Sequence, residues 1–141
     1  MDSVDLISEC EITVRFSDTD AMGVVWHGEY LKYFEDGRES FGEKYGLSYW
    51  YIYDNEVLTP VVKVLCEYKR SISFGEKIVI RTKFINSQAA KIIFEYEVFE
   101  KTKMTLVATG RTEQVFTDIS RNLLYYFPDF FLDWKKKWNL I

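Results

Sequence analysis

FSDTDAMGVVWHGEYLKYFEDGR, residues 16–38, joins a short polar turn to the start of an amphipathic segment. The turn carries two aspartates, Asp18 and Asp20, and one glycine, Gly23, and the chain's one histidine, His27, follows it. A carboxylate opposite the start of a helix can activate water or attack an acyl carbon. The free N–H groups of the first helical turn can hold the oxyanion that develops. The stretch therefore predicts a hydrolytic site between a turn and a helix.

The segment from about 27 to 45 has the spacing of a helix with one buried face. Tyr30, Phe34, Gly37 and Phe41 fall on a single stripe, and most of the charged residues fall outside it. A glycine in the middle of a helix costs about 1 kcal/mol relative to alanine. We therefore expect Gly37 to mark a close approach of this helix to a sheet.

Most of the remaining chain has the pattern of β-strands. Apolar and polar side chains alternate within these segments, and short turns separate them. The five expected strands are 9–17, 57–70, 76–86, 90–101 and 103–119. One central helix and about five long strands predict an α+β fold, in which an antiparallel sheet wraps around the helix.

The tail, residues 128–138, is predicted to form a short helix with Pro128 in its first turn. Its aromatic residues recur at helical spacing, which favours docking on the domain or on a neighbouring subunit. Binding to a membrane surface is the alternative. The short length of the segment and the acidity of the whole chain favour docking.

Composition excludes several classes of function. The 141 residues are expected to form one domain, 1–141, and their net charge of −4, with no basic stripe, argues against nucleic acid as a partner. No apolar run reaches the roughly 18 residues of a membrane span, and no export signal opens the chain. Two separated cysteines and one histidine cannot build a typical zinc site, so no metal is expected. A reducing cytoplasm is the expected compartment.

The stretch D-T-D-x-x-G-V-V-W-H-x-x-Y-L-x-Y-F-E-x-G-R, residues 18–38, resembles the signature of the hot-dog-fold acyl-CoA thioesterases. This family includes 4-hydroxybenzoyl-CoA thioesterase and the Tol-Pal-associated thioesterases. The order of one strand, one helix and four strands also resembles that family over essentially the whole chain. The resemblance implies a hydrolase that cleaves an acyl-CoA or acyl carrier protein thioester without any cofactor. It also implies a homodimer, or a homotetramer of paired dimers, with active sites between subunits.

The resemblance assigns the catalytic role to the second aspartate, Asp20, as general base or nucleophile. On spacing alone a turn residue or a helix N-cap is the more common role for such an aspartate, and the match to the whole motif favours the catalytic role. Asp18 is expected to bond local backbone N–H groups. Glu35 is the rival base, because other hot-dog thioesterases carry a glutamate on this helix; by default it forms an ion pair with Arg38.

His27 is not expected to belong to a nucleophile–histidine–acid triad, because the chain has no G-x-S-x-G elbow and no cysteine in a nucleophile's setting. We expect the backbone N–H groups of His27 and Gly28 to polarise the thioester carbonyl. The histidine ring would add at most a hydrogen bond to the substrate or to Asp20. The alternative is a histidine that merely caps or packs at the helix start.

Substrate contacts are expected from two sets of residues. Val25, Trp26 and Tyr30 are candidates for the acyl pocket or the subunit interface, although the valine fits an ordinary core position equally well. The coenzyme's phosphates need basic side chains, and the candidates, each of which could also be simply solvated, are Lys69, Arg70 and Lys91. Two rivals stand beside the hydrolase. A hydroxyacyl dehydratase would need a proline-rich loop, which WHGEY lacks, and a non-catalytic acyl-binding or regulatory domain would not need Asp20.

Overall fold

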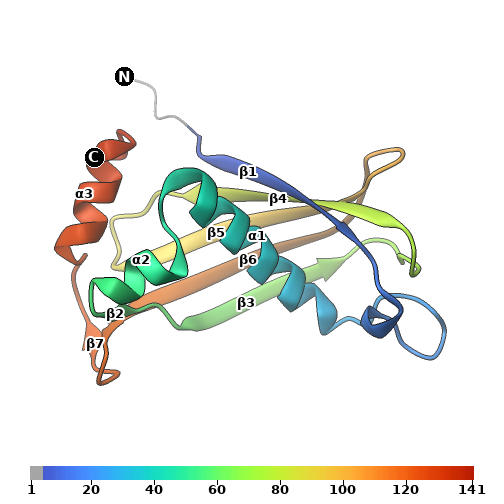
Figure 1. Ribbon diagram of the computed structural model, residues 1–141, viewed down its shortest axis with the longest axis horizontal. Coiled ribbons are helices and arrows are strands. Elements are labelled where there is room, and N and C mark those ends of the chain that lie inside the picture. Colours follow the sequence, from blue (N-terminus) through green and yellow to red (C-terminus); the bar gives the residue numbers. More distant parts are fainter. Residues whose placement is uncertain (1–4) are drawn as a thin grey trace.

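One long helix, α1 (Glu29–Tyr45), lies across one face of an antiparallel sheet in the computed structural model, which describes residues 5–141 (Figure 1). The sheet confirms the expected α+β architecture. It has seven strands rather than about five, because two short strands join the long ones. The strands are β1 (Ile7–Thr13), β2 (Val57–Leu58), β3 (Val61–Tyr68), β4 (Lys77–Ile85), β5 (Lys91–Glu100), β6 (Thr105–Asp118) and β7 (Leu123–Leu124).

The strand order places β1 at one edge and β3 at the other. The main path is β1-β4-β5-β6-β2, and β3 and β7 also pair with β6, all antiparallel. No other strand in residues 5–141 pairs with the outer edge of β3. Both faces of β3 are largely exposed, which the sequence pattern did not predict.

Several element boundaries differ from the sequence-based expectations. The strand expected at 9–17 begins earlier and ends at Thr13, so the alternation that continues to residue 17 does not correspond to strand. The strand expected at 57–70 is broken at Pro60, because proline has no N–H to donate to a ladder. The central helix begins at Glu29 rather than near residue 27, after a short 3-10 turn, η1 (Phe16–Asp18), and a loop. An unpredicted helix, α2 (Tyr49–Asp54), follows α1, and the side chain of Ser48 caps it by accepting a hydrogen bond from the Tyr51 N–H at 3.2 Å.

Gly37 marks a close approach between α1 and β4, as predicted. A Cβ atom at this position would lie 2.4 Å from the Thr82 Oγ1 and 3.1 Å from the Ile80 Cγ2. A second glycine, Gly110 on β6, leaves room for the ring of Phe34, which a Cβ would approach to 2.2 Å. The helix therefore packs on the sheet at a depth that these two glycines set.

The C-terminal helix, α3 (Asp129–Lys137), docks on the end of the domain, as predicted. The indole N–H groups of Trp134 and Trp138 donate to the backbone carbonyl of Tyr45, at 2.8 and 3.0 Å. Tyr45 is the last residue of α1, so these bonds satisfy a carbonyl that the helix leaves unpaired. The aromatic side chains of α3 thus pack against the core and the end of α1.

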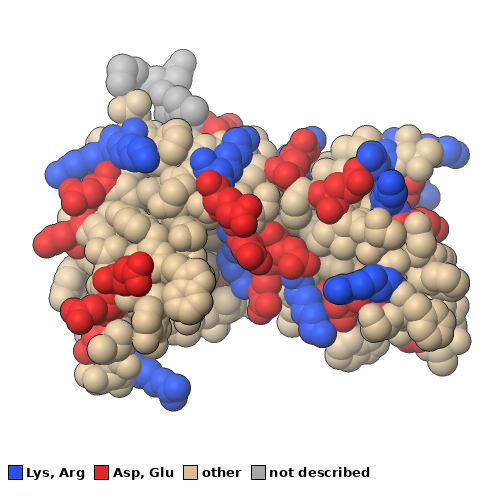
Figure 2. All heavy atoms as spheres, viewed as in Figure 1, with Lys and Arg blue, Asp and Glu red and all other residues tan. Residues whose placement is uncertain are grey.

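Charge on the surface follows the elements. Acidic side chains gather along α1, across the middle of the face seen in Figure 2. The opposite face of the sheet carries cross-strand ion pairs, such as Arg111 with Glu95 at 3.2 Å. Within residues 5–141, no helix has the length and apolarity that crossing a bilayer requires.

Candidate active site

The turn between β1 and α1 folds back on itself as a small hairpin. Thr19 and Val25 form an antiparallel bridge, the Asp20 N–H donates to the Val24 carbonyl at 2.9 Å, and the Trp26 N–H donates to the Asp18 carbonyl at 3.0 Å. Gly23 closes the hairpin with a φ of +78°, a conformation that favours glycine. Residues 18–26 are called the Asp20 hairpin below.

The Asp20 hairpin is fixed to the turn before β4. The Val25 N–H donates to the carbonyl of Ile72 at 2.8 Å, and Val24 forms a bridge with Ser73. Val25 is buried, so this valine belongs to the core rather than to an open pocket. These bonds hold one strand of the hairpin against the turn before β4. Asp20 lies on the other strand, next to the tip.

The Asp20 carboxylate is half-buried and only partly engaged. Its Oδ1 accepts a hydrogen bond from the Met22 N–H at 2.8 Å, which is the local turn contact that the sequence allowed. Its Oδ2 has no partner among residues 5–141, so this oxygen is available to a water molecule or a substrate. Asp18, by contrast, is buried and accepts hydrogen bonds from the Arg15 N–H at 3.0 Å and the Tyr33 hydroxyl at 3.1 Å.

The start of α1 offers unpaired N–H groups beside this hairpin. Gly28 is the N-cap, with helical φ and ψ, and the Glu29 N–H donates to the Trp26 carbonyl at 2.9 Å. Neither the His27 N–H nor the Gly28 N–H has an acceptor in the described chain. A Cβ at position 28 would lie 2.2 Å from the Trp26 ring, so the glycine lets the indole cover the helix start. Donors of this kind can stabilise a developing oxyanion.

The hairpin register sets the spacing between the carboxylate and these donors. Asp20 lies opposite Val24, and His27 follows three residues later, which corresponds to about 10 Å of extended chain. An aspartate side chain, an acyl carbonyl and one hydrogen bond to an N–H span a similar distance.

His27 is exposed and rests against aromatic rings. Its ring centroid lies 5.0 Å from that of Trp26 and 6.4 Å from that of Tyr68, and the Tyr68 hydroxyl donates to the His27 carbonyl at 2.9 Å. Sequence reasoning did not single out Tyr68, although strand alternation places it on the helix-facing side of β3. Tyr30 is buried against Tyr68 at 5.2 Å, and burial raises the pKa of Tyr30 to about 12, so it stays neutral. Trp26 is the exposed member of the three predicted acyl contacts.

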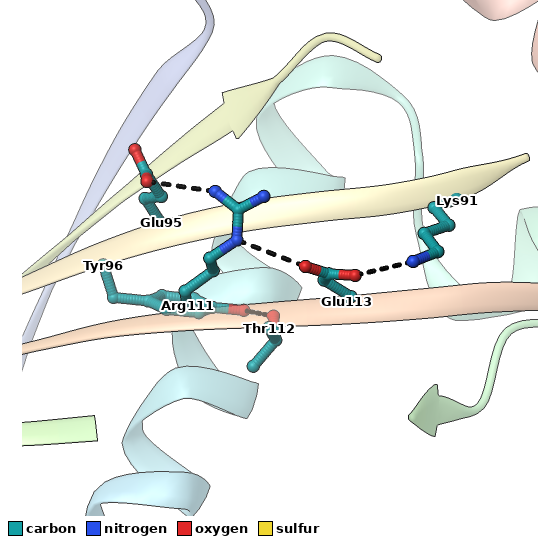
Figure 3. A network of polar contacts seen from close by, with 6 residues as sticks. All are labelled: Lys91, Glu95, Tyr96, Arg111, Thr112 and Glu113. Carbon is teal, nitrogen blue, oxygen red and sulfur yellow. Dashed lines mark hydrogen bonds and ion pairs between the residues drawn. The ribbon is translucent and has the colours of Figure 1, made fainter. Parts of the chain in front are cut away.

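The three basic candidates are not brought together within one subunit. Lys69 and Arg70 lie at the end of β3 next to the hairpin's supporting turn, where both N–H groups donate to the Val107 carbonyl. Lys91 pairs with Glu113 at 2.9 Å in the ion-pair network on the outer face of the sheet (Figure 3). Strand register separates the two places by seven residues of β6, or about 23 Å.

The other sequence candidates have structural surroundings. Glu35 is exposed on α1, 4.0 Å from the Arg38 guanidinium, as the default ion pair predicted. Arg38 also donates to the Tyr96 hydroxyl at 3.0 Å, which contacts Thr112 at 2.6 Å (Figure 3). No cluster of His, Cys, Asp or Glu within residues 5–141 could hold a metal ion.

Comparisons with known proteins show the family and the fold. Residues 14–135 match the family described as the thioesterase-like superfamily. A Bacillus subtilis protein, YneP, provisionally named an acyl-CoA thioesterase, is 31% identical over 105 residues, which are 74% of this chain and 76% of that protein. The crystal structure of DHNA-CoA thioesterase from Staphylococcus aureus superimposes with a TM-score of 0.83 at 31% identity, covering 95% of this chain and 92% of that one.

A more distant structure shares the fold alone. The 4-hydroxybenzoyl-CoA thioesterase from Pseudomonas sp. strain CBS-3 superimposes with a TM-score of 0.78 at 19% identity. The superposition covers 91% of this chain and 98% of that one. The hot-dog arrangement that the resemblance implied is thus confirmed across nearly the whole chain.

Proposed function

The chain belongs to the thioesterase-like superfamily, and on that premise we propose that it hydrolyses an acyl-CoA thioester to a free acid and coenzyme A. One observation carries the proposal: Asp20 presents an unpartnered carboxylate oxygen on a hairpin whose other strand runs into the unpaired N–H groups at the start of α1. The names of the relatives at 31% identity support the same activity. The thioester of an acyl carrier protein is the second substrate to test.

Asp20 is proposed to act on the acyl carbon, either directly as a nucleophile or by taking a proton from an attacking water. The negative charge that develops on the carbonyl oxygen is held by the N–H groups of His27 and Gly28. A thiolate is a good leaving group, so the reaction needs no strong general acid. In the direct route an acyl–aspartate anhydride forms and the thiolate leaves, and water then cleaves the anhydride.

The edge strand β3 supports a homodimer. Its apolar side chains Val62, Val64 and Leu65 are exposed, and an exposed apolar edge of eight residues invites pairing with another strand. Two β3 strands paired antiparallel about a two-fold axis place the Val61 end of one beside the Tyr68 end of the other. The end of the sheet that carries Lys91 in one subunit then approaches the end that carries Lys69 and Arg70 in its partner, where they could hold the coenzyme's phosphates.

Exposed aromatic side chains on α2 support an apolar acyl group. The rings of Tyr49, Trp50 and Tyr53 pack on one another with centroids 5.2 to 6.1 Å apart, yet all three are exposed. Since α2 leads through β2 into the Val61 end of β3, the same two-fold pairing turns these rings toward the partner's helix start. The three rings are proposed to form a wall of the acyl site.

The activity is tested by measuring free-thiol release from a panel of thioesters of increasing chain length and of aryl thioesters, on coenzyme A and on carrier protein. Turnover well above the rate of spontaneous hydrolysis with at least one coenzyme A thioester is expected. Tight binding of acyl-CoA without any thiol release would contradict the proposal and favour the acyl-binding alternative.

The dimer is tested by sedimentation at micromolar concentration. Wild type is expected to sediment at twice the chain mass of 16.8 kDa. The double variant Val62→Glu/Leu65→Glu is expected to be monomeric and inactive, and Lys63→Glu, on the same strand, serves as the control for a surface charge change. A wild-type monomer with full activity would overturn the shared site.

A further inference from the structure

The peptide unit between His27 and Gly28 carries one of the two N–H groups that the proposed mechanism uses as oxyanion donors. Its carbonyl, that of His27, accepts a hydrogen bond from the Tyr68 hydroxyl at 2.9 Å. No other residue in 5–141 donates to this carbonyl, and the Gly28 N–H has no acceptor in the same part of the chain. Among the described residues, Tyr68 therefore makes the one hydrogen bond that holds this peptide.

The geometry of a peptide unit links this bond to the donor on its other side. A planar trans peptide directs its carbonyl and its N–H to opposite sides, and the peptide bonds of residues 5–141 are trans. Because the His27 carbonyl is tied to Tyr68, the Gly28 N–H is directed away from that tyrosine. A hydrogen bond to the carbonyl also polarises the peptide, which makes its N–H a stronger donor. The Tyr68 hydroxyl thus acts on both the direction and the strength of the Gly28 donor.

Aromatic contacts hold Tyr68 in place. Its ring meets the buried ring of Tyr30 edge-on, with centroids 5.2 Å apart, and it meets the ring of His27 at 6.4 Å. Partial burial raises the pKa of Tyr68, so the hydroxyl keeps its proton at neutral pH and remains a donor. Tyr68 is the last residue of β3, where it pairs with Ala108 of β6. The support for the helix start therefore comes from the sheet.

We infer that Tyr68 is a positioning residue of the active site: its hydroxyl orients and polarises the His27–Gly28 peptide, which stabilises the oxyanion of the transition state. The inference rests on the proposed thioesterase function and adds to it a residue that lies outside the motif at 18–38. Tyr68 acts through the backbone of the helix start rather than on the reacting atoms. Lys69 and Arg70 follow it directly, so one segment carries both this support and two of the proposed phosphate contacts.

The first test is the steady-state kinetics of Tyr68→Phe with a coenzyme A thioester that the wild type cleaves. The change removes the hydroxyl alone, and because Tyr68 is 50% exposed, the variant is expected to fold and associate as the wild type does. Loss of a direct oxyanion donor costs about 100-fold or more in kcat. Loss of the support for such a donor is expected to lower kcat by about tenfold, with KM close to the wild-type value, because the bond matters most in the transition state.

Tyr45→Phe is the matched control. The Tyr45 hydroxyl also donates to a backbone carbonyl, that of Ile7 at 2.8 Å, but it does so at the far end of α1. Its removal therefore changes a bond of the same kind without reaching the helix start. The kcat and KM of Tyr45→Phe are expected to equal those of wild type.

A second readout follows the substrate carbonyl directly. Asp20→Asn is expected to slow hydrolysis enough for the infrared band of a bound thioester, isotope-labelled at its carbonyl carbon, to be recorded. A polarised carbonyl absorbs at lower frequency, so the band is expected to shift down on binding to Asp20→Asn and to shift less in Asp20→Asn/Tyr68→Phe. Asp20→Asn/Tyr45→Phe is expected to match Asp20→Asn. A merely structural role for Tyr68 would leave the band where it is in Asp20→Asn.

The outcomes separate the inference from the function on which it rests. A kcat for Tyr68→Phe equal to that of Tyr45→Phe, in proteins of the same sedimenting mass, would overturn the role of Tyr68 and leave the thioesterase function standing. A raised KM with an unchanged kcat, or an unchanged carbonyl band in Asp20→Asn/Tyr68→Phe, would do the same. A wild type that cleaves no thioester would instead overturn the proposed function.

Discussion

Replacing Gly37 with alanine should destabilise the protein, although the same change in an exposed helix would stabilise it by about 1 kcal/mol. The new Cβ would lie 2.4 Å from the Thr82 Oγ1 and 3.1 Å from the Ile80 Cγ2. Thr82 is fully buried, β-branched and without a partner for its hydroxyl, so it cannot move aside easily. Overpacking of this kind costs about 1–3 kcal/mol. The net result should be a loss of about 1 kcal/mol.

A double-mutant cycle separates the clash from the helix propensity. In a Thr82→Ala background the oxygen is gone, so Gly37→Ala should recover most of the propensity gain, giving a coupling of about 1–2 kcal/mol. The free energy of unfolding is measured by urea denaturation of all four proteins at one protomer concentration, because association adds to apparent stability. If Gly37→Ala stabilised the protein in the Thr82 background, or if the two changes were additive, the packing explanation would be wrong.

Three further substitutions test other contacts. Tyr96→Phe should lower the free energy of unfolding by about 1.5–3 kcal/mol, because the partly buried Arg38 guanidinium loses its hydroxyl partner. A decrease below about 0.5 kcal/mol in urea denaturation would count against this contact. Burial lowers the pKa of Lys135, so wild type should gain stability relative to Lys135→Met as pH rises toward the ordinary value of 10.5. Thermal melts of both proteins across pH check the sign. His27→Ala should reduce kcat/KM by about 10- to 100-fold, since only a ring hydrogen bond is lost; a loss as large as that of Asp20→Asn in a folded dimer would make His27 the principal base.

The elements with strong periodicity were predicted correctly from the sequence. The apolar stripe of α1 and the alternation in β5 and β6 predict which side chains face inward. The position of Gly37 in mid-helix predicted the close approach of α1 to the sheet. Helix α2 was not predicted, because six residues are too few to show a helical spacing of apolar residues. Ser48 is a residue type that commonly serves as an N-cap, and it was the one available signal. The break at Pro60 followed from proline's missing N–H, a local rule that the strand pattern around it obscured.

The site was harder to predict because its parts depend on tertiary register. The order of residues in the sequence does not show which end of the sheet a lysine occupies. Lys91 was therefore grouped with Lys69 and Arg70, although the strand pairing puts it about 23 Å away within one chain. Glu29 is buried in the first turn of α1, which its sequence position did not indicate.

The most direct test of the central claim compares thioester hydrolysis by wild type and Asp20→Asn, with Asp133→Asn on the exposed side of α3 as the matched control. Loss of the proposed base or nucleophile should lower kcat/KM by about 100-fold or more. Circular dichroism, sedimentation and the Asp133→Asn rate should match wild type. Full activity in folded, dimeric Asp20→Asn would contradict the account, because the hairpin carboxylate would then take no part in the reaction.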